Sequence, residues 1–168
     1  NTLLPFAAAR PGDILFACQH STSGTSNFSL PTFTLVRETT GTQAPKLRLF
    51  QRTVTDSEPD YTYTSTGSGR VHMFAVRRAG AITASSINRI TSGLLISAPN
   101  LSVPARTLQV AIFATQRPDI DPLFFEPGTI VPIIDLSIAD GVFIGSRNLF
   151  APVTATAALS WGPLGDPT

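Results

Sequence analysis

Apolar and polar side chains alternate with a two-residue period over much of the chain, which is the pattern of half-buried β-strands. In residues 14–20, which follow a turn signal, Ile14, Phe16 and Cys18 fall on one face. The next segment, residues 21–26, contains Ser, Thr and Gly alone and has nothing apolar to bury. We therefore expect a strand followed by a solvated loop or hairpin tip.

The same alternation resumes in residues 33–37 and again in residues 46–54. In the second of these segments Leu47 and Leu49 lie on the face opposite three basic side chains (Lys46, Arg48 and Arg52). This arrangement predicts a strand whose leucines are buried and whose basic residues are in water.

A Tyr–Thr alternation in residues 61–64 is separated by a Gly-Ser-Gly turn signal from a further strand pattern in residues 70–77. Two strand patterns joined by so short a glycine-rich segment are typical of a β-hairpin. We expect residues 61–64 and 70–77 to pair with each other.

The second half of the chain contains further strand patterns, in residues 106–115, 130–138, 141–148 and 154–161. Leu108, Val110 and Ile112 share a face of the first of these strands. Residues 118–127 are rich in Pro and Asp and predict a loop, and residues 79–105 predict an irregular crossover with one helical turn.

The composition supports a fold made of strands. The chain has 168 residues, among them 21 Thr and 15 Ser but only three Glu and one Lys, and its 14 Pro and 12 Gly interrupt any helix. We expect an all-β protein: a single antiparallel, jelly-roll-like β-sandwich of eight to nine strands over residues 1–168. Its halves would be residues 11–78 and 106–161. A tandem repeat of about 60 residues is the competing interpretation.

Charge and hydropathy exclude several partners. Twelve basic and eleven acidic residues give a net charge of +1, which is no excess for binding nucleic acid through its phosphates. No run reaches the ~18 apolar residues of a membrane helix, and the N-terminus lacks a targeting pattern. We expect neither nucleic acid nor membrane insertion. The single cysteine cannot form an internal disulfide.

Three residues could suggest catalysis or metal binding. Cys18 and His20 project to the same side of a strand, and His72 could serve as a base. A cysteine on an apolar strand face is more often a small buried hydrophobe, and the spacing lacks the paired ligands of a structural zinc site. We predict no catalytic residue and no cofactor.

Carboxylates in the Pro-rich segment are candidate ligands for a hard cation. Asp119 and Asp121 lie on one side of an extended stretch, with Glu126 nearby. Asp beside Pro is also ordinary turn chemistry, and the remaining ligands of a helix–loop–helix calcium site are absent. We therefore favour no metal here and keep Asp119 and Asp121 as the candidates.

Basic and aromatic residues flank the predicted hairpin. Arg70, Arg77 and Arg78 lie near Tyr61 and Tyr63. Such residues are enriched both in ligand-binding surfaces and at the rims of subunit interfaces. The pattern leaves both interpretations open.

Several short segments together resemble a β-sandwich domain of tailed-phage structural proteins that also occurs in bacterial surface proteins. The resemblance covers roughly residues 11–78 and is looser in the second half. Its segments are a Pro-Gly-Asp opening, a Pro-containing approach, a strand with aromatic and basic residues, a Tyr–Thr stretch and an Ala-Val-Arg close (residues 11–15, 30–36, 47–52, 58–64 and 74–77).

This resemblance implies a non-enzymatic structural protein on the virion surface, either a capsid decoration or a fibre component. Such a protein acts by assembly with other virion proteins, as a homo-oligomer and in host attachment. The apolar run Leu123, Phe124 and Phe125 is the candidate contact patch. The alternative is a carbohydrate-binding module of a phage or bacterial surface protein. It would stack glycans, including host-surface glycans, on three aromatic side chains (Tyr61, Tyr63 and Trp161).

Overall fold

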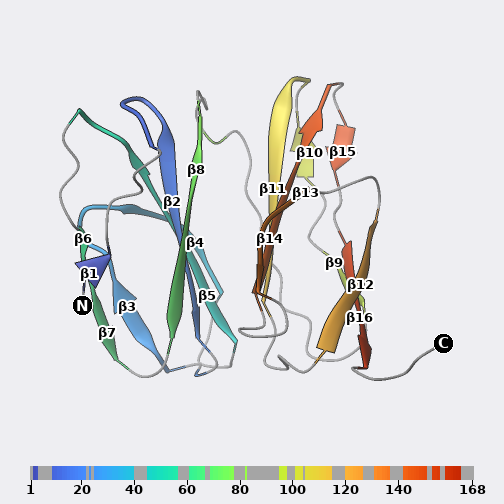
Figure 1. The fold of residues 1–168 in the computed structure, drawn as a ribbon, viewed down its shortest axis with the longest axis horizontal. Helices are drawn as coiled ribbons and strands as arrows, with labels where there is room; N and C mark the ends of the chain where they lie inside the picture. The colour runs from blue at the N-terminus through green and yellow to red at the C-terminus, as the bar shows by residue number, and fades with distance from the viewer. Residues whose placement is uncertain are drawn as a thin grey trace. The chain divides into compact units, whose positions relative to one another are not determined.

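The computed structural model describes strands and the turns and segments next to them. The described residues are 2–3, 9–21, 23, 25–39, 45–56, 61–66, 69–77, 82, 95–97, 101–103, 105–114, 120–126, 131–136, 142–150, 153–155 and 158–163. Within these ranges every regular element is a β-strand and every strand pair is antiparallel. The prediction of an all-β antiparallel fold is therefore confirmed (Figure 1).

The chain divides into two compact units, Asn1–Ile82 and Thr83–Thr168. The boundary falls inside the predicted crossover of residues 79–105. That crossover is not wholly irregular, because it contains two short strands, β9 (Leu95–Ser97) and β10 (Leu101–Val103). A single sandwich formed by both halves remains a prediction.

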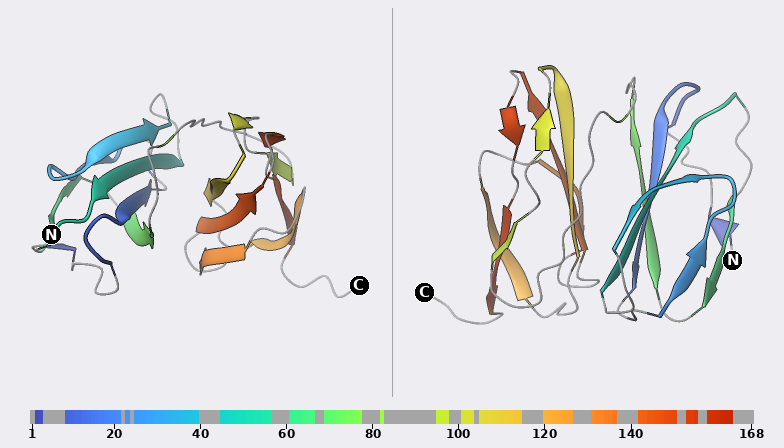
Figure 2. Two further views of the ribbon diagram at one scale, coloured as in Figure 1. Left: turned by 90° about the horizontal axis from the view of Figure 1, so that it is seen from above. Right: turned by 180° about the vertical axis from the view of Figure 1, so that it is seen from behind.

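A four-stranded sheet with the order β4-β5-β2-β8 is the main element of unit 1. Its strands are β2 (Ile14–Ser21), β4 (Thr34–Glu38), β5 (Lys46–Thr53) and β8 (Arg70–Val76). The central strand β2 pairs with β5 on one side and with β8 on the other. This central position explains why nearly every β2 side chain is buried, polar ones included. Figure 2 shows the same four strands from two further directions.

A tight turn leads the chain into β2. The backbone N–H of Asp13 donates to the carbonyl of Arg10 at 2.9 Å, and Gly12 has a φ of +88°. Pro11 at the second turn position and a left-handed glycine at the third are the signature of a type II turn. The turn signal in the sequence is thus confirmed. Gly12 is needed there because side-chain-bearing residues rarely adopt this φ.

Two short antiparallel pairs complete unit 1. Strand β1 (Thr2–Leu3) pairs with β6 (Tyr61–Thr62), and β3 (Asn27–Ser29) pairs with β7 (Thr64–Thr66). The hairpin predicted between residues 61–64 and 70–77 is therefore wrong. Closeness in sequence favours pairing, but β8 gains a longer ladder by adding to the buried strand β2.

The core of unit 1 lies between the sheet and these short strands. The rings of Phe28 and Phe50 are 5.5 Å apart, and the ring of Phe33 meets Tyr61 edge-on at 5.0 Å. Aromatic pairs at these separations stabilise a core beyond their buried area alone. The buried cluster has eight members: Leu15, Ala17, Phe28, Leu30, Phe33, Phe50, Val54 and Tyr61.

The buried face of β5 is the opposite of the predicted one. Lys46, Arg48 and Phe50 are buried, whereas Leu47 and Leu49 are only half-buried. The prediction was wrong because a two-residue period separates two sets of side chains without showing which set faces the core. Phe50 enters the aromatic core, and the two basic residues of its set follow it to the inside.

Two residues of the segment 21–26, which was predicted to be solvated, are buried. Ser21 extends β2 and is buried, and Ser26 is buried with its hydroxyl donating to the carbonyl of Thr66 at 3.0 Å. Ser23, by contrast, is only half-buried. Hydroxyl groups can be buried when their hydrogen bonds are satisfied, which a polar composition alone does not reveal.

The described strands of unit 2 form three small antiparallel sheets, with the orders β11-β14-β13, β12-β16-β9 and β10-β15. Their remaining strands are β11 (Thr107–Ala114), β12 (Ile120–Glu126), β13 (Val131–Leu136), β14 (Val142–Leu149), β15 (Val153–Ala155) and β16 (Ala158–Pro163). The predicted strand at residues 154–161 is thus two strands. Among the described residues the chain has sixteen strands, several of two or three residues, against the eight to nine expected.

Strand β11 has Gln109 and Ala111 buried and Leu108 38% exposed. One prediction for unit 2 needs correction. Residues 118–127 were predicted to be a loop but include strand β12. Pro122 is tolerated because β12 is an edge strand of its sheet and its pairing with β16 shifts just after this residue.

Candidate functional site

The structure brings the predicted cysteine and histidines together on one face of the unit 1 sheet. Cys18 on β2 lies opposite His72 on β8, and His20 lies two residues further along the same face, opposite Arg70. Cys18 and His20 are both buried. The spatial grouping of Cys18, His20 and His72 is therefore real, and the chemistry depends on the state of the thiol.

Burial keeps the thiol of Cys18 protonated. Loss of solvation raises its pKa from 9.0 to about 12. A thiol nucleophile must ionise near neutral pH, usually with help from a nearby positive charge or a helix N-terminus. Cys18 therefore behaves as a small buried hydrophobe, which favours the non-catalytic interpretation of this group.

The raised pKa of Cys18 predicts an alkaline weakness. Below pH 9 the thiol is protonated in both the folded and the unfolded chain. Between pH 9 and about 12 only the unfolded chain ionises, so stability falls as pH rises, on the order of 1 kcal/mol per pH unit. Urea unfolding at several pH values should show this slope in the parent chain.

The matched variant for this measurement is Cys18→Ala. It lacks the ionisable group, so its stability should fall less steeply above pH 9, although the smaller side chain lowers stability at every pH. Every other contribution is common to both proteins and cancels in the difference. Equal slopes in the two proteins would contradict the raised pKa.

Two of the three candidate glycan-stacking residues lie in or against the core of unit 1. Tyr61 is 1% exposed, with the guanidinium carbon of Arg52 5.8 Å from its ring centroid. Tyr63 is half-buried and its ring lies 5.2 Å from that of Phe28. Trp161 belongs to unit 2, on β16. Tyr61 thus offers no open ring face to a sugar, which is a correction to the predicted stacking surface.

The candidate contact patch falls on strand β12. Phe124 and Phe125 pair with Ser160 and Leu159 of β16, and Leu123 lies at the irregularity between the two paired stretches. The prediction of these residues as an apolar cluster in a loop is corrected to an edge strand.

One of the two candidate cation ligands lies within the part of the chain that the structure describes. Asp121 lies on β12 opposite Gly162 of β16, and Asp119 lies outside the described residues. No group of three or more His, Cys, Asp or Glu side chains suited to a metal ion is found within the described ranges. No helix among them is long and apolar enough to cross a membrane.

One of the flanking arginines has a clear structural partner. The Nε of Arg77 lies 3.7 Å from Oδ2 of the buried Asp13, and the same oxygen accepts a hydrogen bond from the backbone N–H of Arg10 at 2.9 Å. Arg77 is itself exposed, so this ion pair adds little, whereas the backbone hydrogen bond stabilises the entry turn of β2. Arg78 lies outside the described residues, and Arg70 is exposed.

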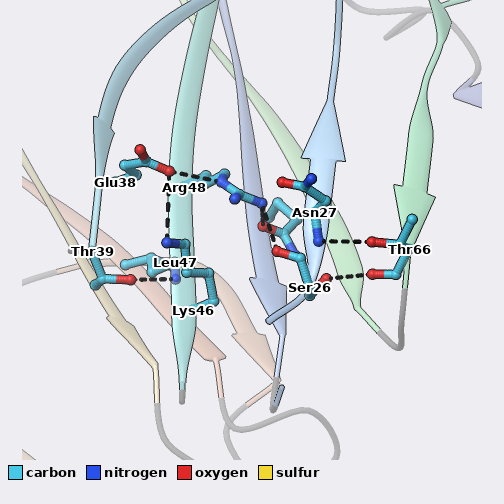
Figure 3. A network of polar contacts seen from close by, with 9 residues as sticks. Ser26, Asn27, Glu38, Thr39, Lys46, Leu47, Arg48 and Thr66 are labelled. Atoms are coloured by element: carbon cyan, nitrogen blue, oxygen red, sulfur yellow. Dashed lines mark hydrogen bonds and ion pairs between the residues drawn. The ribbon is translucent and has the colours of Figure 1, made fainter. Parts of the chain in front are cut away.

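One polar group of unit 1 was not predicted from the sequence. Arg48, 8% exposed, donates from Nε to Oε2 of Glu38 at 2.9 Å, and Nζ of Lys46 lies 3.8 Å from the same oxygen. Figure 3 shows one carboxylate oxygen of Glu38 joined by dashed lines to both basic side chains. We call Glu38, Lys46 and Arg48 the ionic cluster.

The guanidinium of Arg48 also reaches two other segments of unit 1. Its Nη1 donates to the backbone carbonyl of Ser26 at 3.2 Å and, at a long 3.5 Å, to Oε1 of Gln19. Ser26 and Asn27 are in turn hydrogen-bonded to Thr66 (Figure 3). One side chain thus contacts β2, β4 and the segment before β3.

This arrangement indicates a structural role for the ionic cluster. The five guanidinium N–H groups of an arginine form a rigid fork that can satisfy several acceptors at once. Here the acceptors come from three segments of the same unit. The alternation of Lys46, Arg48 and Phe50 on one side of β5 was visible in the sequence, and Phe50 was the signal that this side faces the core.

Comparison with known proteins adds no assignment, because no family model, curated protein or solved structure matches the chain.

Proposed function

We propose that this chain is a non-enzymatic structural protein on the surface of a tailed-phage virion, as a capsid decoration or a fibre component. It acts by binding copies of itself and other virion proteins, and the resulting assembly takes part in host attachment. The proposal rests on the resemblance of residues 11–78 to phage β-sandwich domains and on the edge position of strand β12.

The observation that supports assembly most directly is the position of β12. In the order β12-β16-β9, this strand lies at the edge of its sheet among the described strands, and it contains the run Leu123 to Phe125. An edge strand presents backbone N–H and C=O groups that can pair with another chain. Aromatic residues, such as the two phenylalanines of this run, are enriched at the centres of subunit interfaces.

The state of the other candidate residues agrees with a protein that acts by contact. The protonated, buried thiol of Cys18 argues against cysteine catalysis, and the burial of Tyr61 weighs against the carbohydrate-binding alternative. The low proportion of charged residues, 14%, suits broad subunit contacts, whose centres are depleted of charge.

A substitution in β12 tests the assembly. Phe124→Asp places a carboxylate on the edge strand, where burying it in an interface would be costly. We expect the parent chain to have the mass of an oligomer in light scattering and the variant to have the mass of a monomer. Circular dichroism should show strand content in both.

The control is Phe150→Asp, which introduces the same charge at an apolar residue of unit 2 that is 82% exposed and follows β14. This variant should keep the mass of the parent. A monomeric parent, or loss of mass in Phe150→Asp but not in Phe124→Asp, would contradict assembly through β12.

The particle assignment has its own test. Genes for capsid, portal or tail proteins beside the coding gene would support it, and antibody against the purified chain should then label intact particles in electron microscopy. An oligomer whose gene has no such neighbours, and whose antibody labels no particle, would contradict the virion role while leaving assembly intact.

A further inference from the structure

The pairing of edge strand β4 with β5 shifts once along its length. Before the shift Leu35 lies opposite Phe50, and after it Glu38 lies opposite Arg48. Between these two pairs β4 has one residue more than β5, and Val36 is that additional residue. Such an insertion is a β-bulge.

The bulge decides which charge faces Arg48. If the one-to-one pairing before Val36 continued, Arg37 would lie opposite Arg48, and Glu38 would lie opposite Leu47 on the other face of the sheet. Like charges directly opposite each other in a strand pair are destabilising, and opposite charges are stabilising. A shift of one residue thus replaces repulsion by attraction.

We propose that the buried guanidinium of Arg48 sets the register of β4 by selecting the bulged pairing, which brings Glu38 within 2.9 Å. Arg48 is a positioning residue in this role. A buried cation that lacks a carboxylate partner is much less stable than a paired one, whereas an exposed cation has no such requirement. Burial of Arg48 therefore gives the charge at its partner position a large effect on register.

The end of β4 agrees with this pairing. The backbone N–H of Thr39 donates to the carbonyl of Leu47 at 2.9 Å, and the N–H of Leu47 donates to the hydroxyl of Thr39 at 3.1 Å. Both bonds belong to the shifted register, so the segment after β4 could set the register in place of Arg48. The experiment has to separate these two causes.

Exchanging the two charges, in the double variant R37E/E38R, separates them. If Arg48 selects the register, the variant should lose the bulge, because a carboxylate then lies opposite Arg48 without it. Nuclear Overhauser contacts across the strands should move from the pair 37 and 49 to the pair 36 and 49. The single variant Arg37→Gln keeps Glu38 and should retain the parent contacts.

A milder variant keeps the proposal testable if the double variant does not fold. Glu38→Gln removes the charge that Arg48 selects, and the backbone amides of residues 38 and 39 should then exchange with solvent at least about tenfold faster, with β2 unchanged. Retention of the contact between residues 37 and 49 in R37E/E38R, or unchanged exchange in Glu38→Gln, would overturn the proposal.

Discussion

The Arg48→Met variant should unfold with a free energy about 1–3 kcal/mol lower than that of the parent chain, the usual cost of leaving a buried acceptor without its donor. Glu38 is partly exposed and can regain water, but the acceptors on Gln19 and Ser26 lose their donor inside the protein. Urea unfolding of the full chain, followed by circular dichroism, measures the change.

Two comparisons show whether this loss comes from the ionic cluster. Arg37→Met removes an exposed arginine from the neighbouring strand and should change stability by less than about 0.5 kcal/mol. The double variant of Arg48→Met with Glu38→Gln should lose less unfolding free energy than the two single variants lose together, because the residues are in direct contact. Additive losses would mean that the pair is not coupled.

The second large effect is expected for Tyr61→Ala, which should lower the free energy of unfolding by about 3–5 kcal/mol, as for other large aromatic side chains removed from a core. Tyr61 is fully enclosed, meets the ring of Phe33 edge-on and lies beneath the guanidinium of Arg52. The surrounding side chains fill the resulting cavity only in part, which adds to the cost. The same urea titration gives the value.

The matched control is Tyr63→Ala, two residues along the chain. Tyr63 is only half-buried, so this variant should lower the free energy of unfolding by about 1–2 kcal/mol. Tyr61→Phe keeps the ring and should remain much closer to the parent than Tyr61→Ala. Equal losses at positions 61 and 63 would contradict the placement of Tyr61 in the core, and would reopen its use as an exposed stacking surface.

The positions of most long strands follow from the alternation of side chains. Strands β2, β5 and β8 begin at or close to the expected residues, because strand-forming side chains there are bounded by Pro, Gly and Asp. The entry turn of β2 was also predictable, since Pro11 and Gly12 occupy the positions that a type II turn requires. These features depend on local conformational preferences.

The partners of the strands were less predictable. The expected hairpin does not form, and the two-residue strands β1 and β6 pair across almost sixty positions of the chain. Strand β12 was hidden because Pro122 argues against a strand unless the strand lies at a sheet edge. Pairing is a long-range choice that no single segment encodes.

The sequence by itself determined that this protein is built of antiparallel strands, and which side chains share a face on β2, β5 and β8. Only the tertiary structure decided which face turns inward, and so placed Arg48 beside Glu38 and the thiol of Cys18 away from water. The physical reason is that a two-residue period is symmetric between the two faces of a strand. The choice between them is made by the segments that pack on the sheet.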